Sequence, residues 1–349
     1  MQRISLISIV FILSCTSPNS IQEQGTNEER ILLNEVKDLF GTSLNTIKYF
    51  GEERPKEEVI SLGQKLFYDA RLSRDGTVSC SRCHLPQLHF TDGLTKSKGT
   101  KDRSAPRNAQ TLINTAGQIS QHWDGNRKDV EEQAIKSFFI KVPFDLDNEE
   151  HLKEKLISNN YAKDFSKAFE INLKKEDAKK LAKLSAQAIG AFERTLVGPS
   201  RFDDYLDGDV KRLTNKEARG LKKFVEFGCI GCHSGQLVGG EMYQKFGVVE
   251  DPYQYTKSDK RDLGRYNFTK NEDDKEYFKV PPLRNVTNTA PYFHDGSVAS
   301  LDQAIYIMGK VQLGIEIEKK DREDIMAFLS TLETKEEVMR ELTKIPSLP

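Results

Sequence analysis

The pentapeptides Cys80-Ser81-Arg82-Cys83-His84 and Cys229-Ile230-Gly231-Cys232-His233 decide the fold class of this chain. In each, two cysteines separated by two residues are followed at once by a histidine. This is the pattern of covalent c-type haem attachment, in which the thiols bond to the porphyrin and the imidazole binds the iron. Zinc needs four ligands that converge, and these two pairs lie far apart in the chain. We therefore expect two c-type haems, with His84 and His233 as iron ligands.

Each pentapeptide is followed by a related series of short segments, which indicates an internal repeat. After the first motif the series is Arg107-Asn108-Ala109, Asn114-Thr115-Ala116, Trp123-Asp124-Gly125 and Gln133-Ala134-Ile135. After the second motif it is Arg284-Asn285-Val286, Asn288-Thr289-Ala290, His294-Asp295-Gly296 and Gln303-Ala304-Ile305. The repeat predicts two modules in tandem, one for each haem.

Apolar residues follow a helical period through most of the chain. One helix face is formed by Val59, Leu62, Leu66 and Phe67, and another helix is expected over residues 178–196. Glycine, proline and asparagine in residues 71–125 and 234–299 predict loops around the haems. We expect an all-α fold of two tandem cytochrome c-like domains, residues 31–199 and 200–349, with the boundary at Gly198-Pro199-Ser200.

The first thirty residues are predicted to be an export signal and a polar tether. Arg3 precedes an apolar stretch over residues 4–13, which is too short to span a bilayer as a mature helix. Cys15, the only cysteine outside the two motifs, ends a segment similar to a bacterial lipoprotein box. We expect a periplasmic protein with a lipid anchor at Cys15; an ordinary secretory signal is the alternative.

Composition excludes two classes of protein. The 52 basic and 53 acidic side chains give a net charge of −1, whereas a nucleic-acid-binding protein should carry a basic excess. No run of 18 or more apolar residues occurs, which excludes a helical membrane protein.

The two modules differ at the sixth iron ligand. Met308 lies 75 residues after His233, far enough for the chain to return on the opposite face of the haem, whereas Met242 lies only nine residues after His233. At the position equivalent to Met308 the first module has Phe138, which offers iron no lone pair. We expect a His233/Met308 haem with a raised reduction potential and a His84 haem with an open or weakly held distal side. A histidine cap from His89, His122 or His151 is the alternative for the first haem.

Taken in order, these motifs resemble the bacterial di-haem cytochrome c peroxidase and MauG family over residues 55–330. The carrying segments, besides the two haem motifs, are Phe90-Thr91-Asp92-Gly93, Pro106-Arg107-Asn108-Ala109, Trp123-Asp124-Gly125, Val280-Pro281-Pro282-Leu283-Arg284-Asn285-Val286 and Pro291-Tyr292-Phe293-His294-Asp295-Gly296. The resemblance implies that the N-terminal haem reduces hydrogen peroxide to water. It implies that electrons enter at the C-terminal haem from a small soluble donor, a cytochrome c or a cupredoxin. Homodimers are common in this family.

The resemblance also implies roles for individual residues. Trp123 matches a tryptophan between the haems, Gln133 a polar residue of the peroxide pocket, and His294 a histidine near a propionate of the second haem. A calcium ion between the haems would be bound by the side-chain oxygen of Asn108 and the carbonyls of Thr289 and Pro291. Met308 stands where MauG-like proteins have a tyrosine, which favours the peroxidase branch.

Two positions depart from the peroxidase pattern. Thr100 replaces a distal histidine, so the first haem is expected to be open without reductive activation. Pro143 replaces a glutamate that moves protons during cleavage of the peroxide bond, and Asp145 or Asp147 could substitute for it. These departures leave two alternatives: a MauG-like oxidase that modifies a partner protein, and a non-catalytic electron carrier or redox sensor.

Overall fold

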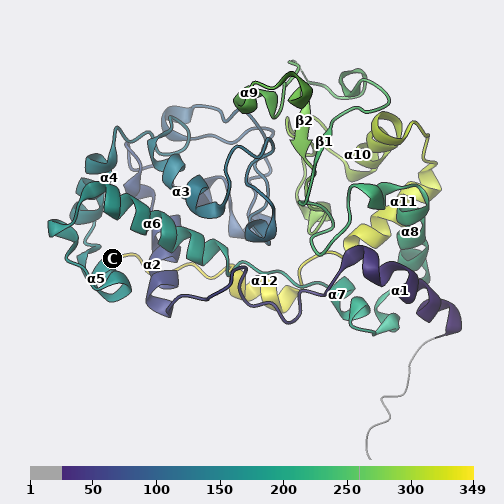
Figure 1. Ribbon diagram of the computed structural model, residues 1–349, viewed down its shortest axis with the longest axis horizontal. Helices are drawn as coiled ribbons and strands as arrows, with labels where there is room; N and C mark the ends of the chain where they lie inside the picture. The colour runs from purple at the N-terminus through teal and green to yellow at the C-terminus, as the bar shows by residue number, and fades with distance from the viewer. Residues whose placement is uncertain (1–25, 259) are drawn as a thin grey trace, which may run out of the picture.

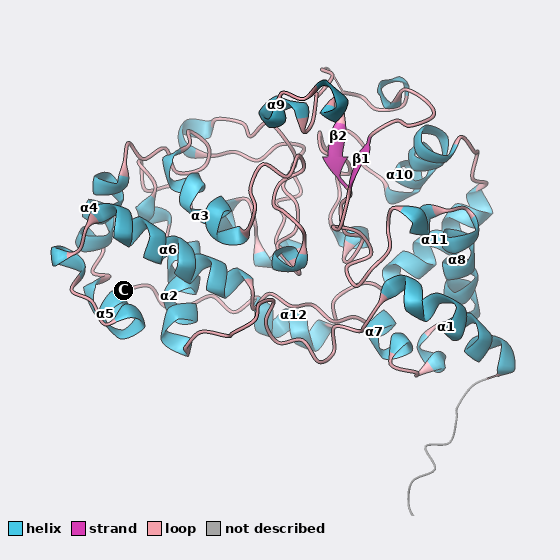
Figure 2. Cartoon of the chain, viewed as in Figure 1, coloured by secondary structure: helices cyan, strands magenta, loops and turns pink. Residues whose placement is uncertain are grey.

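The computed structural model describes residues 26–258 and 260–349, and in them the chain is mostly helical (Figures 1 and 2). The helices are α1 (Asn27–Phe40), α2 (Glu57–Tyr68), α3 (Val130–Phe139), α4 (Glu149–Ser158), α5 (Ala162–Phe169), α6 (Ala178–Glu193), α7 (Arg201–Leu206), α8 (Asn215–Glu226), α9 (Tyr266–Thr269), α10 (Leu301–Met308), α11 (Lys319–Ser330) and α12 (Glu336–Leu342). Two short strands, β1 (Tyr243–Lys245) and β2 (Tyr277–Lys279), form an antiparallel pair. The expected α-helical character is confirmed, and this short antiparallel strand pair is the addition to it.

The helices gather into two groups, each around its own apolar cluster. In the first group, α2 packs on α6, and the four residues expected on one face of α2 are all buried. In the second group, α8 packs on α11 around a cluster that includes Leu221, Phe224 and Phe328. The antiparallel pair of β1 and β2 lies between the groups (Figure 1). The first CxxCH motif therefore follows α2 of the first group, and the second CxxCH motif follows α8 of the second group.

Helices α1 and α12 each pack on the group formed mainly by the other half of the sequence. Helix α1 packs with the second cluster through Leu33, Val36 and Phe40, although it precedes the first haem motif in sequence. Helix α12 contacts the Phe67 cluster of the first group through Met339 and Leu342, and the C-terminus lies beside α2 and α5 (Figure 1). Each group is thus completed by a helix from the far end of the chain.

Residues 27–30, which the sequence assigned to the polar tether, form the first turn of helix α1. Helix α1 begins at Asn27 because Thr26 and Glu29 form a capping box, in which each side chain accepts a hydrogen bond from the backbone N–H of the other. Cys15 and the export signal lie outside the described residues. No helix in the described part of the chain is long and apolar enough to cross a membrane.

The internal repeat is present, but its register differs from the sequence alignment. Asn114 and Asn285 both adopt a left-handed conformation with φ of 63°, and both precede a 3₁₀ turn. The side-chain oxygen of Asn114 accepts from the Gly198 N–H at 2.8 Å, and that of Asn285 from the Thr334 N–H at 2.8 Å. Asn114 therefore corresponds to Asn285 and not to Asn288, because each forms the same hydrogen bond, one to the segment after α6 and the other to the segment after α11.

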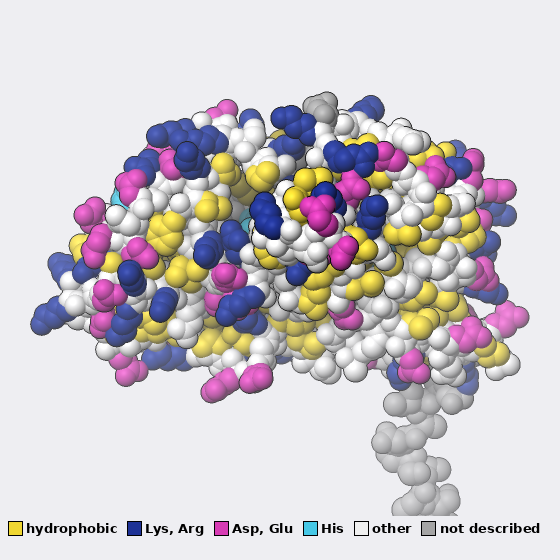
Figure 3. Space-filling model, turned by 45° about the horizontal axis from the view of Figure 1, so that its top comes forward, with side chains coloured by type: hydrophobic (Ala, Val, Ile, Leu, Met, Phe, Trp, Pro, Cys, Tyr) yellow, Lys and Arg dark blue, Asp and Glu magenta, His cyan; other side chains and the backbone are white. Residues whose placement is uncertain are grey.

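Charges of both signs are interspersed on the face shown in Figure 3, with apolar side chains between them. This agrees with the net charge of −1. On that face no single sign of charge dominates, so its electrostatic field is local.

Candidate haem sites

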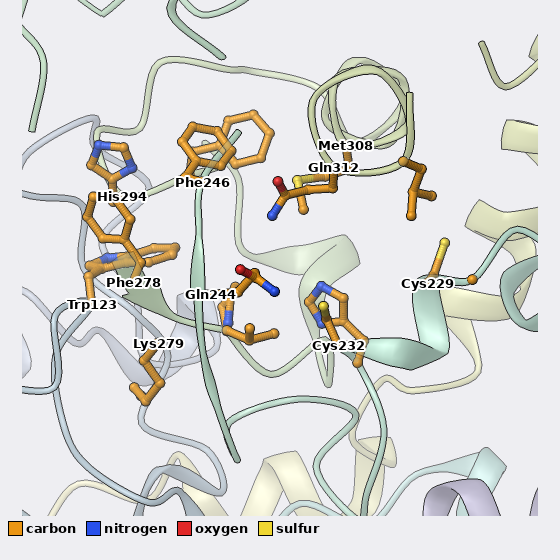
Figure 4. Close-up of a pocket in the computed structure, with 16 residues that line it drawn as sticks. Trp123, Cys229, Cys232, Gln244, Phe246, Phe278, Lys279, His294, Met308 and Gln312 are labelled. Atoms are coloured by element: carbon orange, nitrogen blue, oxygen red, sulfur yellow. The ribbon is translucent and has the colours of Figure 1, made fainter. Parts of the chain in front are cut away.

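The second CxxCH motif lines a cavity with about 770 Å³ of empty space. Helix α8 ends at Glu226, and Gly228, with φ of 87°, turns the chain into the 3₁₀ turn Cys229–Gly231. Cys229, Cys232 and His233 line the cavity, and Met308 also lines it. Figure 4 shows Met308 and Gln312 reaching into the cavity from α10 and the turn after it, with Cys229 and Cys232 on other sides. The cavity size and donor set fit a covalently attached haem.

The cavity contains a buried histidine nitrogen without a protein partner. His294 Nε2 forms no hydrogen bond in the described structure, whereas the His233 ring interacts with the backbone carbonyls of Val238 and Pro281. Burial lowers the pKa of His233 to about 4, so its ring is neutral and able to bind a metal. Gly239, with φ of 121°, lets the backbone pass this ring, since a Cβ there would lie 3.1 Å from His233 Nδ1 and 2.5 Å from the Pro281 carbonyl oxygen. Burying such a nitrogen without a partner is costly, so an acceptor on a group bound in this cavity would satisfy His294 Nε2.

Met308 is the methionine that lines this cavity, and Met242 does not line it. Met308 ends α10 and is followed directly by a π-helical turn, Gly309–Leu313. Counted from the N-caps Asp129 and Ser300, Met308 corresponds to Ser137 in α3 and not to Phe138. Phe138 is buried in the apolar cluster of the first group. Neither Ser137 nor Phe138 offers a thioether, so the prediction of different sixth ligands in the two modules is unchanged by the corrected register.

One wall of the cavity is aromatic and extends toward the first module. The ring of His294 stacks on Phe278 at a centroid distance of 4.3 Å and meets Trp123 edge-on at 6.4 Å. Trp123 Nε1 donates to the carbonyl of Asn108 at 3.0 Å. Trp123 lines this cavity and also the second one described below. The tryptophan therefore lies where the two modules meet.

The first CxxCH motif has the same local design. Cys80–Arg82 forms a 3₁₀ turn, and His84 Nδ1 lies 3.0 Å from the Phe90 carbonyl oxygen. A carbonyl at Nδ1 makes that nitrogen the donor and leaves Nε2 as the metal-binding atom. Cys80 packs with the apolar clusters of the first group. His84 is thus oriented by the backbone of its own loop.

The residues expected near the first haem form hydrogen bonds with other protein groups. Gln133, in α3, donates from its side-chain amide to Ser137 Oγ at 2.9 Å. Thr100 is buried, and both its hydroxyl and its N–H donate to the Pro143 carbonyl. The two positions that depart from the peroxidase pattern are therefore hydrogen-bonded to each other.

Asp145 and Asp147 are engaged by arginines. Arg103 contacts Asp145 at 2.8 Å, and Arg74 contacts both carboxylates. Hydrogen bonds from these guanidinium groups lower the pKa of both acids. A carboxylate held in this way is a poor general base, because protonation would break its ion pair.

Two of the three alternative histidine caps, His122 and His151, have side-chain partners of their own. His122 Nδ1 lies 2.8 Å from Asn126 Oδ1, and burial lowers the pKa of His122 to about 4. His151 Nδ1 lies 3.3 Å from Asp147. His89 is half-buried in a left-handed conformation at the end of a 3₁₀ turn.

A second cavity, with about 510 Å³ of empty space, collects the three residues expected to bind calcium. Asn108, Thr289 and Pro291 all line it, together with Trp123. Asn108 Nδ2 donates to the Leu94 carbonyl at 2.9 Å. The side-chain oxygen of Asn108 therefore points away from Leu94. Calcium takes oxygen ligands of this kind, with water completing the shell.

Three side chains at these sites carry no signal in the sequence. Lys279, in β2, is 1% exposed, lines the haem cavity and donates to the Gln118 side chain; burial lowers its pKa to about 7. Glu193, at the end of α6, is buried near Cys80, and its pKa is raised to about 8 by burial and by Glu131. Gln312 lines the haem cavity. Their burial depends on contacts between distant segments, so no local pattern marks them.

Comparisons with known proteins agree with this geometry. The family model for di-haem cytochrome c peroxidase matches residues 57–211. The chain is 41% identical over 278 residues to cytochrome c551 peroxidase of Nitrosomonas europaea, covering 79% of this chain and 80% of the relative. It is 39% identical to cytochrome c551 peroxidase of Pseudomonas aeruginosa, with 80% of both chains covered.

Among solved structures, the chain is similar to a MauG-like protein associated with microbial copper homeostasis. The TM-score is 0.73 at 28% identity, and the match covers 86% of this chain and 98% of the other. Both CxxCH motifs, the cavity with His233 and Met308, and these similarities lead to one assignment. The chain belongs to the di-haem cytochrome c peroxidase family and is an oxidoreductase of that class, with the two c-type haems that the family implies.

Proposed function

We propose that this protein reduces hydrogen peroxide to water with electrons from a small soluble donor, a cytochrome c or a cupredoxin. Electrons enter at the C-terminal haem and pass to the N-terminal haem, where peroxide reacts. The observation that carries the proposal is the asymmetry between the modules: Met308 and His233 line one haem cavity, whereas Ser137 takes the place of the methionine in the first module. When bound, the two haems supply the iron centres that carry electrons and cleave peroxide.

The protein's contribution at the second haem is ligation and electron entry. Cys229 and Cys232 would attach the porphyrin, and His233 and Met308 would bind its iron. Methionine ligation raises the reduction potential, which suits a haem that accepts electrons. His294, whose Nε2 is buried without a partner, donates to a propionate.

At the first haem, Cys80 and Cys83 attach the porphyrin and His84 binds the iron. The side-chain amide of Gln133, which Ser137 holds at 2.9 Å, orients peroxide on the other side. Because Pro143 has no proton to transfer and Asp145 is bound by Arg103 and Arg74, no carboxylate among these positions is free for acid–base catalysis. Such catalysis typically contributes 10²–10⁴-fold, so we expect turnover below that of a peroxidase that has the glutamate.

Trp123 connects the sites, and calcium stabilises their junction. Trp123 lines both cavities, which supports a role in electron transfer between the haems. The Asn108 side chain and the carbonyls of Thr289 and Pro291, residues that line the second cavity, would hold the calcium ion. Metal analysis of the purified holoprotein should find calcium, and Asn108→Ala should reduce its content; equal calcium in both proteins would remove Asn108 from the ligand set.

The protein acts in the periplasm, with its N-terminus lipidated at Cys15. The support is the sequence of residues 1–30, in which a cation and an apolar stretch precede Cys15. Cell fractionation should find the wild-type protein with membranes and the Cys15→Ser variant in the soluble periplasmic fraction. The same distribution for both proteins would contradict the lipid anchor.

The test of the proposed function is peroxide-dependent oxidation of a reduced small cytochrome c, measured with the protein fully oxidised and half-reduced. We expect turnover in both states, because Thr100 replaces the distal histidine and is bonded to Pro143. Turnover only after reduction would mean that a side chain caps the first iron. No turnover in either state, with both haems present by absorption, would contradict peroxidase activity.

A further inference from the structure

Gln312 connects the π-helical turn after Met308 to the segment that leaves β1. Its side-chain oxygen accepts hydrogen bonds from the N–H groups of Gly247 and Val248, both at 3.0 Å. Its side-chain nitrogen donates to the Lys245 carbonyl, also at 3.0 Å. One amide therefore binds three backbone groups of a single segment, although 64 to 67 residues separate them from Gln312 in the chain.

Backbone hydrogen bonds fasten the same turn to the same segment. The Val249 N–H donates to the Val311 carbonyl at 2.9 Å, and the Glu250 N–H donates to it at 3.4 Å. Gly314, with φ of 68°, ends the turn against the Val249 side chain. The turn that follows Met308 is thus held from outside its own helix.

The position of the Met308 side chain depends on this turn. A π-helical turn is rare and is found most often at functional sites. Met308 is the last residue of α10, and the turn begins at the next residue. Figure 4 shows the side chains of Met308 and Gln312 next to each other at the cavity. A shift of the turn would therefore move Met308 relative to His233.

We propose that Gln312 is a positioning residue for the iron ligand Met308, acting by clamping the Gly309–Leu313 turn to Lys245, Gly247 and Val248. A neutral thioether is a weak ligand, so its bond to iron depends on how well the protein holds it in place. The proposal rests on the proposed Met308 ligation of the second haem. Gln312 itself does not bind the iron.

The test uses the Gln312→Leu variant of the holoprotein, with both haems attached. The near-infrared charge-transfer band of methionine-ligated ferric haem should weaken or disappear, and the midpoint potential of the second haem should fall, because methionine ligation raises it. Imidazole, titrated as a competing ligand, should bind this haem on the order of tenfold more tightly, as expected for the loss of one to two net hydrogen bonds.

Two further variants separate positioning from general stability. Gln312→Glu keeps an acceptor for Gly247 and Val248, so it should retain the methionine band; a loss equal to that in Gln312→Leu would contradict the role of these hydrogen bonds. Gln64→Leu is the matched control, since the Gln64 amide also bridges distant segments by donating to the Lys344 carbonyl at 3.0 Å. It lies in the first helix group and should leave the band and the titration unchanged.

The outcomes distinguish this inference from the proposed function. A wild-type protein without the methionine band would overturn Met308 ligation itself. A wild-type band that is unchanged in Gln312→Leu, with unchanged imidazole binding, would overturn only the role of Gln312. If Gln312→Leu does not accumulate with both haems, Gln312→Asn, whose side chain is one methylene shorter and cannot span the three bonds, is measured with the same two readings.

Discussion

Buried ionisable side chains are the residues whose properties depend most on their surroundings. Glu193 is 4% exposed and Lys279 is 1% exposed, and burial moves the pKa of each toward neutrality, to about 8 and about 7. Arg284 and Asp203, by contrast, are buried together at 2.7 Å, with two more hydrogen bonds to Asp203 from the Leu44 and Ser200 N–H groups. A buried charge with partners keeps its ionisation, whereas one without a close opposite charge tends to lose it.

The Glu193 carboxyl should make stability depend on pH. With a raised pKa, the folded protein keeps this proton up to about pH 8, whereas the unfolded chain loses it near the ordinary glutamate pKa of 4.5. The folded state binds more protons in that window, so stability falls as pH rises through it. Glu193→Gln, which imitates the neutral acid, should remove this fall and raise the free energy of unfolding at pH 8 by a few kcal/mol.

Denaturant unfolding of the holoprotein at several pH values between 5 and 8 measures this effect. Glu226→Gln is the control, because the Glu226 side chain is 47% exposed. A pH dependence that is the same in wild type and Glu193→Gln would show that the folded protein does not hold this proton.

At the scale of elements, two glycines allow the main helix pairs to cross closely. A Cβ at Gly63 in α2 would lie 1.8 Å from the Ala188 carbonyl oxygen of α6, and one at Gly220 in α8 would lie 1.9 Å from the Asp324 carbonyl oxygen of α11. Both glycines lie on the helix that leads into a CxxCH motif. Each helix pair therefore sets the position from which its haem motif starts.

Gly63→Ala and Gly220→Ala should each destabilise the protein by about 1–3 kcal/mol, the usual cost of overpacking, despite the higher helix propensity of alanine. Lys222→Ala, at an exposed position of α8, is the control for the substitution to alanine. The measurement is the midpoint of denaturant unfolding. Stabilisation by either glycine variant would mean that the helices can separate without cost.

At the scale of the whole molecule, the ends of the chain join the two helix groups. Helix α1 is buried against the second group, and α12 contacts the first. Arg107 adds a bond between the halves, because it pairs with Asp124 at 2.6 Å and with Asp262 at 2.7 Å. The two groups are therefore joined at their junction by Arg107 and by helices α1 and α12.

Because α12 packs on the first helix group, substitutions in α12 should destabilise that group, although it lies far away in the sequence. The double variant Met339→Ala/Leu342→Ala should lower stability by roughly 2–4 kcal/mol through lost apolar burial. Hydrogen exchange should speed up in α2 and α6 and stay unchanged in α8 and α11, with Glu337→Ala as the exposed control. Faster exchange in α8 and α11 alone would contradict the crossing of the chain ends.

Several features could be read from the sequence because they depend on residues close together in the chain. The CxxCH spacing specifies haem attachment through local chemistry, and the period of Val59, Leu62 and Leu66 specifies α2. Met308 could be chosen over Met242 from chain length alone, since reaching the opposite side of a haem needs a long return. The predicted alignment of the repeat was wrong by three residues at Asn114. The spacers differ in length between the modules, and only the structure shows which asparagines form equivalent hydrogen bonds.

Only the tertiary structure decided how distant segments meet. It placed α1 and α12 on opposite helix groups, bonded Thr100 to Pro143, and paired Asp145 with two arginines. It also buried Glu193 and Lys279 and brought Gln312 onto the segment after β1. A sequence specifies the ligand chemistry of a haem protein locally, whereas burial, ion pairing and the support of a weak ligand arise from contacts between segments that only folding brings together.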